Sequence, residues 1–187
     1  MKSKLRFYLI RLHFGALALF LINECIKYFT KFELAELAEF VVVLAAVISA
    51  IILFFLYRKP FARINYYFSL YVGTLSLIIA TTFLNGFLGL ILLHVLVLPL
   101  VPQGVEHRQG DIIFYNANEG FMSMCCTYQI KERYGLIFEK DLGTMVVEEG
   151  GPLLFSTVDL EINEREVILS YDTGLEELGI QTVIAPR

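Results

Sequence analysis

INYYFSLYVGTLSLIIATTFLNGFLGLILLHVLVLPLVPQGV, residues 64–105, decides the layout of this chain, because its forty-two residues include no Asp, Glu, Lys or Arg. A single α-helix of that length would be roughly 60 Å long, twice the ~30 Å thickness of the hydrocarbon core of a bilayer. Asn85-Gly86, near the middle, has the residue types that favour a turn. The stretch therefore predicts a helical hairpin of two membrane spans.

Two further apolar segments precede this hairpin. Hydrophobic residues make up 57% of the chain, above the ~45–50% of ordinary soluble domains, and we predict four spans at about 7–29, 37–57, 64–84 and 86–102. A cleaved signal peptide is the alternative for the first segment, but Arg11 and His13 interrupt its apolar run and no small-residue cleavage site follows. Thr30 and Glu33 have the T-x-x-E spacing of a capping box, which predicts the start of the second helix there.

Charge predicts the orientation of these spans. Arg58, Lys59 and Arg63 form the densest basic connection, which the positive-inside rule assigns to the cytoplasm. An even number of crossings then puts both termini in the cytoplasm of a plasma (inner) membrane and the connection near residue 30 outside. The net charge is −4 and no basic stripe occurs, which argues against a nucleic-acid partner. Tyrosines near the inner boundary predict an aromatic belt: Tyr8, Tyr57, Tyr66 and Tyr67.

From residue 103 onward, the hydrophobic pattern changes to a period of two, which is typical of strands with one buried face. Residues 121–130 show it most regularly, and we expect further strands at 112–115, 136–140, 158–162, 167–171 and 180–184. Residues 132–135 and 163–166 are predicted hairpin connections, and residues 173–179 a short helical turn. The predicted fold is an α+β membrane protein, with a four-transmembrane-helix bundle (1–103) followed by a small antiparallel β-sheet soluble module (104–187) in the cytoplasm.

His94 is the candidate for an intramembrane site, because an ionisable residue within a span is a functional hypothesis by default. Measured from the helix ends, other polar residues are expected at comparable depth, and Glu24 or His13 is a candidate second station. The structural interpretation is that His94 makes a hydrogen bond that specifies helix packing. The alternative is a proton relay or a small-solute site. The three histidines are too scattered to predict a metal site. The candidate intramembrane polar residues are His94, Ser49, Thr74, Ser76 and Glu24.

Catalytic motifs are not found in the sequence. It has no Gly-rich phosphate loop, nucleophile elbow or H-E-x-x-H, and Cys25, Cys125 and Cys126 form no C-x-x-C pair. We therefore predict no catalytic residue, cofactor or metal. The favoured function is a non-enzymatic, multi-pass protein that anchors a β-module binding a protein partner or a further copy of itself. The alternative is an oligomeric small transporter or channel subunit with a polar midplane site around His94.

Overall fold

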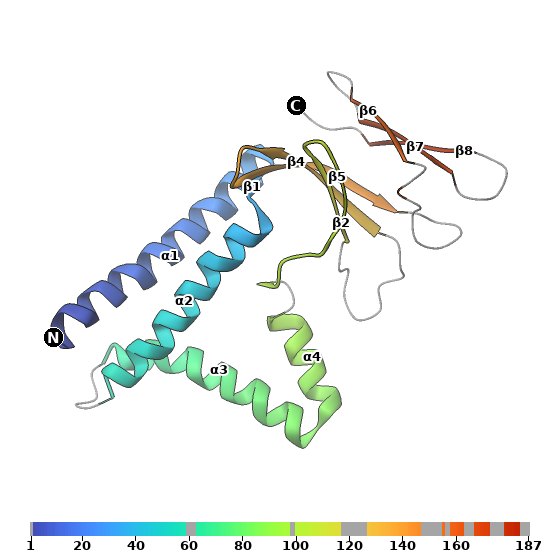
Figure 1. The fold of residues 1–187 in the computed structure, drawn as a ribbon. Coiled ribbons are helices and arrows are strands. Elements are labelled where there is room, and N and C mark those ends of the chain that lie inside the picture. Colours follow the sequence, from blue (N-terminus) through green and yellow to red (C-terminus); the bar gives the residue numbers. More distant parts are fainter. Residues whose placement is uncertain are drawn as a thin grey trace. The chain divides into compact units, whose positions relative to one another are not determined.

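A computed structural model describes residues 2–58, 63–97, 100–116, 127–146, 155, 158–162, 167–172 and 178–183. Within these ranges the protein is α+β, with four helices, a five-stranded antiparallel sheet and a three-stranded sheet (Figure 1). It divides into two compact units, Met1–Cys25 with Glu36–Pro102, and Ile26–Ala35 with Gln103–Arg187. We call these the helical unit and the β unit. The β unit thus contains a segment that the sequence assigned to the membrane part.

The helices are α1 (Lys2–Thr30), α2 (Glu36–Leu56), α3 (Asn65–Leu84) and α4 (Gly86–Leu96). The first three are long and apolar enough to cross a membrane. The predicted turn is confirmed, because Asn85 ends α3 and its side-chain oxygen accepts a hydrogen bond from the Leu88 backbone N–H at the start of α4.

The fourth predicted span, 86–102, begins with a helix that is shorter than a full membrane crossing. α4 has 11 residues, and at 1.5 Å per residue it is about 16 Å long, short of the ~30 Å hydrocarbon core. Pro99 in the sequence disfavours a longer helix, because a residue that precedes proline is disfavoured in the α conformation and a proline lacks the backbone donor; residues 98–99 themselves lie outside the described residues. The described helices therefore supply three candidate spans and one short apolar helix.

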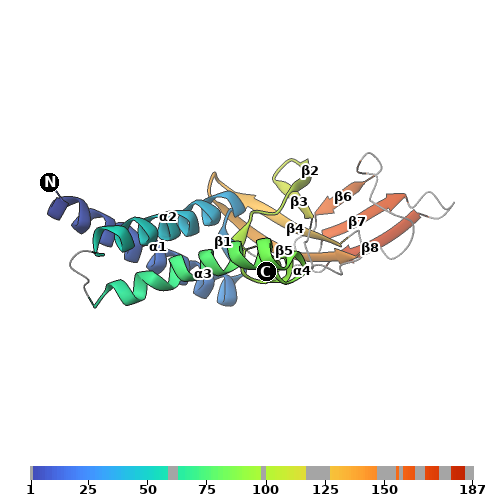
Figure 2. The ribbon, with the colours of Figure 1, turned by 90° about the horizontal axis from the view of Figure 1, so that it is seen from below.

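The core of the helical unit lies where α2 and α3 meet. Ala50, Leu53 and Phe68 are fully buried there, and Leu9 and Ile10 of α1 pack against them. Figure 2 shows α1 and α2 alongside each other. They are antiparallel, because polar contacts join opposite ends of the pair: Arg6 Nη2 donates to the Leu56 carbonyl at 2.5 Å, and Asn23 Nδ2 donates to Glu39 Oε2 at 3.2 Å.

The five-stranded sheet has the order β1-β5-β4-β3-β2 and belongs to the β unit. Its strands are β1 (Phe32–Leu34), β2 (Val105–Gln109), β3 (Ile112–Asn116), β4 (Thr127–Tyr134) and β5 (Phe138–Val146). The second sheet has the order β6-β7-β8, from β6 (Asp159–Ile162), β7 (Val167–Asp172) and β8 (Leu178–Val183). All pairs are antiparallel.

Most predicted strands are confirmed, with shifts at their ends. The connection expected at 132–135 lies later, because β4 continues to Tyr134 and the chain turns at Gly135, whose φ is +70°. β2 and β1 are strands that the period-two pattern missed. Residues 121–126 and 163–166, and most of the helical turn expected at 173–179, lie outside the described residues. The buried face of the large sheet is apolar, with Ile112, Phe114, Ile130 and Met145 at most 2% exposed.

β1 corrects two predictions. Thr30 does not cap α2, because it ends α1 and its hydroxyl donates to the Ile26 carbonyl; Glu33 lies in β1, and α2 begins at Glu36. The pairs Phe32↔Lys140 and Leu34↔Phe138 join β1 to β5. Hydrogen-bonded strands must lie on the same side of a membrane, so an outer connection at residue 30 is incompatible with a cytoplasmic β-module. Only α2 and α3 of the three candidate spans separate β1 from β2, and this even number agrees with the shared sheet.

Substituting Gly89 tests the α3–α4 contact. A Cβ atom at this position would lie 2.3 Å from the backbone Cα of Thr82, so Gly89→Ala forces the two helices apart. We expect a loss of about 1–3 kcal/mol, the usual cost of overpacking, measured as a lower unfolding temperature in mild detergent.

Gly73→Ala is the matched control. A Cβ at Gly73, in the middle of α3, meets nothing within 4 Å, and alanine is the better helix former by about 1 kcal/mol. We expect its unfolding temperature to be unchanged or raised. Equal unfolding temperatures for the two variants would contradict the close approach of α3 and α4.

Candidate functional site

The most deeply buried titratable group of the helical unit is His13, whose side chain is 0% exposed. It lies a little before the middle of α1 and is surrounded by aromatic rings. The rings of Phe14, Tyr67, Phe68 and Tyr71 have their centroids 5.1–5.6 Å from the imidazole centroid, all edge-on. An imidazole in such an apolar cage needs a partner for each ring nitrogen, because an unpaired buried polar atom is costly.

Both nitrogens of His13 have that partner. Nδ1 lies 2.9 Å from the Ala46 carbonyl oxygen and 3.3 Å from Ser49 Oγ on α2, while Nε2 lies 2.9 Å from the Tyr67 hydroxyl on α3. A carbonyl only accepts, so Nδ1 carries a proton and donates to Ala46. In the neutral imidazole Nε2 therefore accepts from the Tyr67 hydroxyl. These bonds join α1, α2 and α3 at one point.

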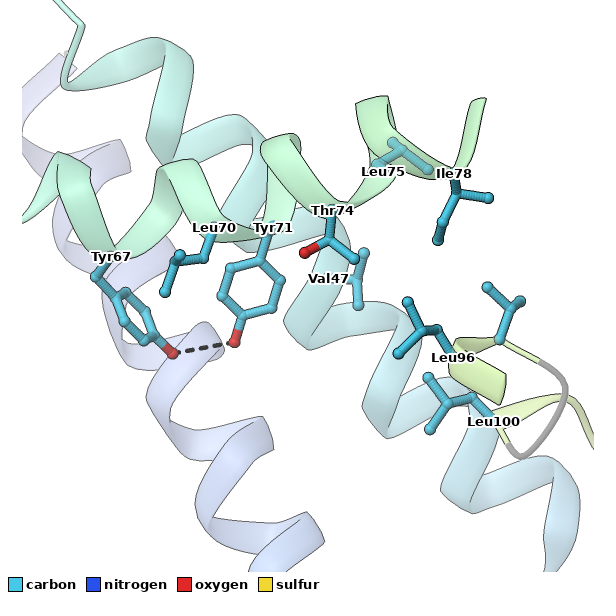
Figure 3. Close-up of a pocket in the computed structure, with 10 residues that line it drawn as sticks. Val47, Tyr67, Leu70, Tyr71, Thr74, Leu75, Ile78, Leu96 and Leu100 are labelled. Atoms are coloured by element: carbon cyan, nitrogen blue, oxygen red, sulfur yellow. Dashed lines mark hydrogen bonds between the residues drawn. The ribbon is translucent and has the colours of Figure 1, made fainter. Parts of the chain in front are cut away.

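The hydrogen-bond chain continues along α3. The Tyr67 and Tyr71 hydroxyls lie 3.0 Å apart (Figure 3). With neutral His13, Tyr71 donates to Tyr67 and Tyr67 donates to Nε2; with the imidazolium, Nε2 donates to Tyr67 and the chain reverses. A proton delivered to the Tyr71 hydroxyl by an outside donor would pass through Tyr67 to Nε2, with each hydroxyl losing one proton as it gains another and no heavy atom moving.

A cavity of about 460 Å³ lies beside the two tyrosines (Figure 3). Tyr67, Tyr71 and Thr74 supply its hydroxyl groups, and every other residue lining it is aliphatic. Such a cavity suits an apolar chain that ends in a hydrogen-bonding group. The aliphatic lining comes from Val47, Leu70, Leu75, Ile78, Leu96, Val97 and Leu100.

The residues predicted to share a midplane layer lie in different environments. Ser49 is buried and contacts His13, whereas His94 lies half-buried in the last turn of the short helix α4. Thr74 lines the cavity. Ser76 and Glu24 are exposed. A functional role for this layer around His94 stays a prediction.

The sequence predicted other roles for His13 and Tyr67. Tyr67 was expected in an aromatic belt together with Tyr66, but it is half-buried and bonded to His13, whereas Tyr66 is 68% exposed. The available signal was the i, i+4 spacing of Tyr67 and Tyr71, which places both hydroxyls on one face of a helix. Of the topology-determining residues, Arg58 and Arg63 are exposed and Lys59 lies outside the described residues.

A second polar cluster is buried in the β unit. Glu33 of β1 forms ion pairs with Lys131 of β4, at 2.6 Å, and with Lys27 of α1. The side chains of Glu33 and Lys131 are each 1% exposed. Burial raises the pKa of the Glu33 carboxyl, but the charge and hydrogen bond of Lys131, and then those of Lys27, outweigh it and hold this pKa below its usual value.

Glu139 lies beside this ion pair, directly opposite Glu33 on the neighbouring strand. Its side chain is buried and accepts a hydrogen bond of 2.8 Å from the Tyr115 hydroxyl. The Lys131 ammonium lies 5.1 Å from the centroid of the Tyr115 ring, within reach of a cation–π interaction. Two carboxylates and two ammonium groups thus balance in charge, which suits a structural tie across the sheet.

Among the described residues, few groups meet the requirements of metal sites or of thiol chemistry. No group of three His, Cys, Asp or Glu side chains that would hold a metal ion occurs among these residues. Cys25 is an exposed free thiol near the end of α1. Cys125 and Cys126 lie outside the described residues.

Removing the Tyr67 hydroxyl tests the buried histidine cluster. Tyr67→Phe leaves His13 Nε2 without its hydrogen-bond donor, so we expect a loss of about 1–3 kcal/mol in the free energy of unfolding. The control is Tyr66→Phe on the neighbouring, exposed residue, where we expect a change within about 0.5 kcal/mol. Thermal unfolding in detergent measures both; equal stability of the two variants would contradict the bond to His13.

Glu33→Gln tests the ion pair in the β unit. It removes the carboxylate paired with the buried Lys131 charge, and we expect a loss of about 3–5 kcal/mol. The exposed Glu106→Gln is the control. Because the pKa of Glu33 is lower in the folded protein than its ordinary value of 4.5, its stabilising effect is present above pH 4.5 and lost as the pH falls through the folded pKa. This acid-dependent loss should be smaller in Glu33→Gln, as measured by unfolding at a series of pH values.

Comparison of the chain with known protein families, with curated proteins and with solved structures finds no match. The function is therefore argued from this protein's own contacts.

Proposed function

We propose that this protein is a non-enzymatic, multi-pass protein of the plasma (inner) membrane that anchors the β unit and presents it to a protein partner or to a second copy of itself. The observation that carries the proposal is the pairing of β1 with β5. It makes the connection between two candidate membrane helices part of the sheet of the β unit.

The sequence distances make this attachment tight. A single residue, Lys31, separates α1 from β1, and only Ala35 separates β1 from α2. The ion pairs of Glu33 with Lys131 and Lys27 add side-chain contacts at the same strand. Such short connections keep β1 close to the ends of α1 and α2, which favours recognition of a partner near a membrane over capture on a long flexible tether.

The orientation follows from charge and from the shared sheet together. Arg58 and Arg63 flank the connection between α2 and α3, which the positive-inside rule assigns to the cytoplasm. With α1, α2 and α3 as the spans, the N-terminus shares that side. The β1 segment and the whole β unit are then on the outer side, in place of the cytoplasmic location that four spans implied.

Cysteine labelling in intact cells tests this orientation. In a chain with its three cysteines replaced by serine, we expect Arg108→Cys on the exposed strand β2 to react with a membrane-impermeant maleimide. Arg63→Cys should react only after the membrane is opened. The reverse pattern would place the β unit in the cytoplasm and disprove the proposed orientation.

The outer edge of β2 is where we expect a protein partner or a second copy to bind. Among the described residues, β2 is one of the two edge strands of the five-stranded sheet, and an edge offers backbone groups to an added strand. A photo-crosslinking amino acid at Arg108 should give a discrete protein adduct or a dimer in native membranes. The same group at Leu70, exposed on α3, serves as the control, with lipid adducts expected; lipid or no adducts at both positions would count against an interaction module.

The hydrogen-bond chain from His13 through Tyr67 to Tyr71, beside the cavity, supports a second candidate function. A small oligomeric transporter or channel subunit would use this chain for proton transfer, with the His13 cluster in the role first considered for His94. Proton flux in proteoliposomes that is lost in Tyr71→Phe and kept in Tyr66→Phe would support this function. Absence of flux in the wild-type protein would exclude it.

A further inference from the structure

The turn between β4 and β5 exposes an unusual amount of apolar surface. Leu136 is 86% exposed, and Ile137, Phe138 and Tyr134 are between 44% and 50% exposed. Gly135, with its positive φ, makes the turn possible. We call residues 134–138 the hairpin tip. Apolar side chains gathered at the exposed end of a β-hairpin are seldom left in water.

The register of the sheet fixes where this tip lies along β1. Leu34 is paired with Phe138, and the Ala35 backbone N–H donates to the Ile137 carbonyl at 2.9 Å. Because β5 is antiparallel to β1, the β5 residues that pair with successive residues of β1 come closer and closer to the β4–β5 turn. The hairpin tip is therefore at the end of β1 from which the chain enters α2, at Glu36.

The sequence of α2 gives the depth of that point. Glu36 and Glu39 are its last charged residues before the uncharged segment that starts at Phe40. Four residues of helix rise about 6 Å, and a headgroup layer is about 5–7 Å thick on each side of the hydrocarbon core. Ala35, and Ile137 bonded to it, thus lie at headgroup depth, where aromatic and apolar side chains are favoured.

We propose that the hairpin tip inserts into the lipid headgroup layer of the membrane in which α1 and α2 end, so that its occupant is the bilayer. The proposal rests on the membrane anchoring proposed above and does not depend on which side of the membrane the β unit occupies. Two exposed aromatic residues at the end of α1, Tyr28 and Phe29, lie close in sequence to β1 and fit the same layer. The β unit then touches the membrane through the tip as well as through its covalent connections.

The absence of tryptophan from the chain makes the test direct, because one introduced Trp is the only indole. Three full-length single-Trp variants are compared in liposomes that contain lipids carrying a quencher near the headgroup or deep in the acyl chains. Leu136→Trp reports on the tip, Val146→Trp on the opposite end of β5, and Ile48→Trp on an exposed position in the middle of α2.

We expect Leu136→Trp to emit at shorter wavelength than Val146→Trp and to lose most of its fluorescence to the shallow quencher, while Val146→Trp is unaffected. Ile48→Trp should be quenched by the deep lipids. If Ile48→Trp is quenched and Leu136→Trp is not, the insertion of the tip is disproved while the anchoring stands. If Ile48→Trp also escapes quenching, the anchoring itself fails. A Leu136→Trp that is shielded from aqueous quenchers but insensitive to lipid quenchers would identify a protein contact and overturn the lipid assignment.

Discussion

The backbone pairing of β1 with β5 is the constraint on which the rest of this structure depends. Three residues between two apolar helices become the edge strand of a sheet whose other strands begin seventy residues later. For helices that cross a membrane, this pairing requires an even number of crossings between β1 and β2, and α2 and α3 are the two described helices in that interval that are long and apolar enough. The buried ion pair of Glu33 and Lys131 exists only because β1 lies in the sheet, and its low exposure strengthens the attraction between the charges.

The sequence predicted the elements whose signal is local. Long uncharged blocks predicted the helices, Asn85-Gly86 the break between α3 and α4, and period-two alternation most of the strands. β1 has no such signal, because three residues are too few for a period and Thr30 and Glu33 also match a capping box. Its identity depends on hydrogen bonds to residues 138–140, more than a hundred positions away. This single short strand decides which connections share a side of a membrane, and the predicted crossing parity did not take it into account.

The polar cluster was missed for a related reason. His94 was selected because it lies at the centre of a predicted span that reaches residue 102. The helix α4 ends at Leu96, so His94 lies near the end of its helix and not at its centre. His13 is close to the N-terminus and was considered only as a second station. Its burial depends on the packing of α1 against two other helices, where Ser49 and Tyr67 meet its two nitrogens. Sequence spacing within one helix carries no information on contacts between different helices.

α1 is held by polar contacts as well as by the packing of Leu9 and Ile10 on the core. Within lipid, apolar side chains gain little by leaving the acyl chains for another helix, so hydrogen bonds and close packing decide which faces meet. Arg6 and His13 are seven residues apart and share a face of α1, and both bond to α2. At its other end, Lys27 pairs with Glu33 in the sheet. Arg6 and His13 therefore fix which face of α1 meets α2 within the helical unit, while Lys27 acts within the β unit, where it strengthens the hold on β1.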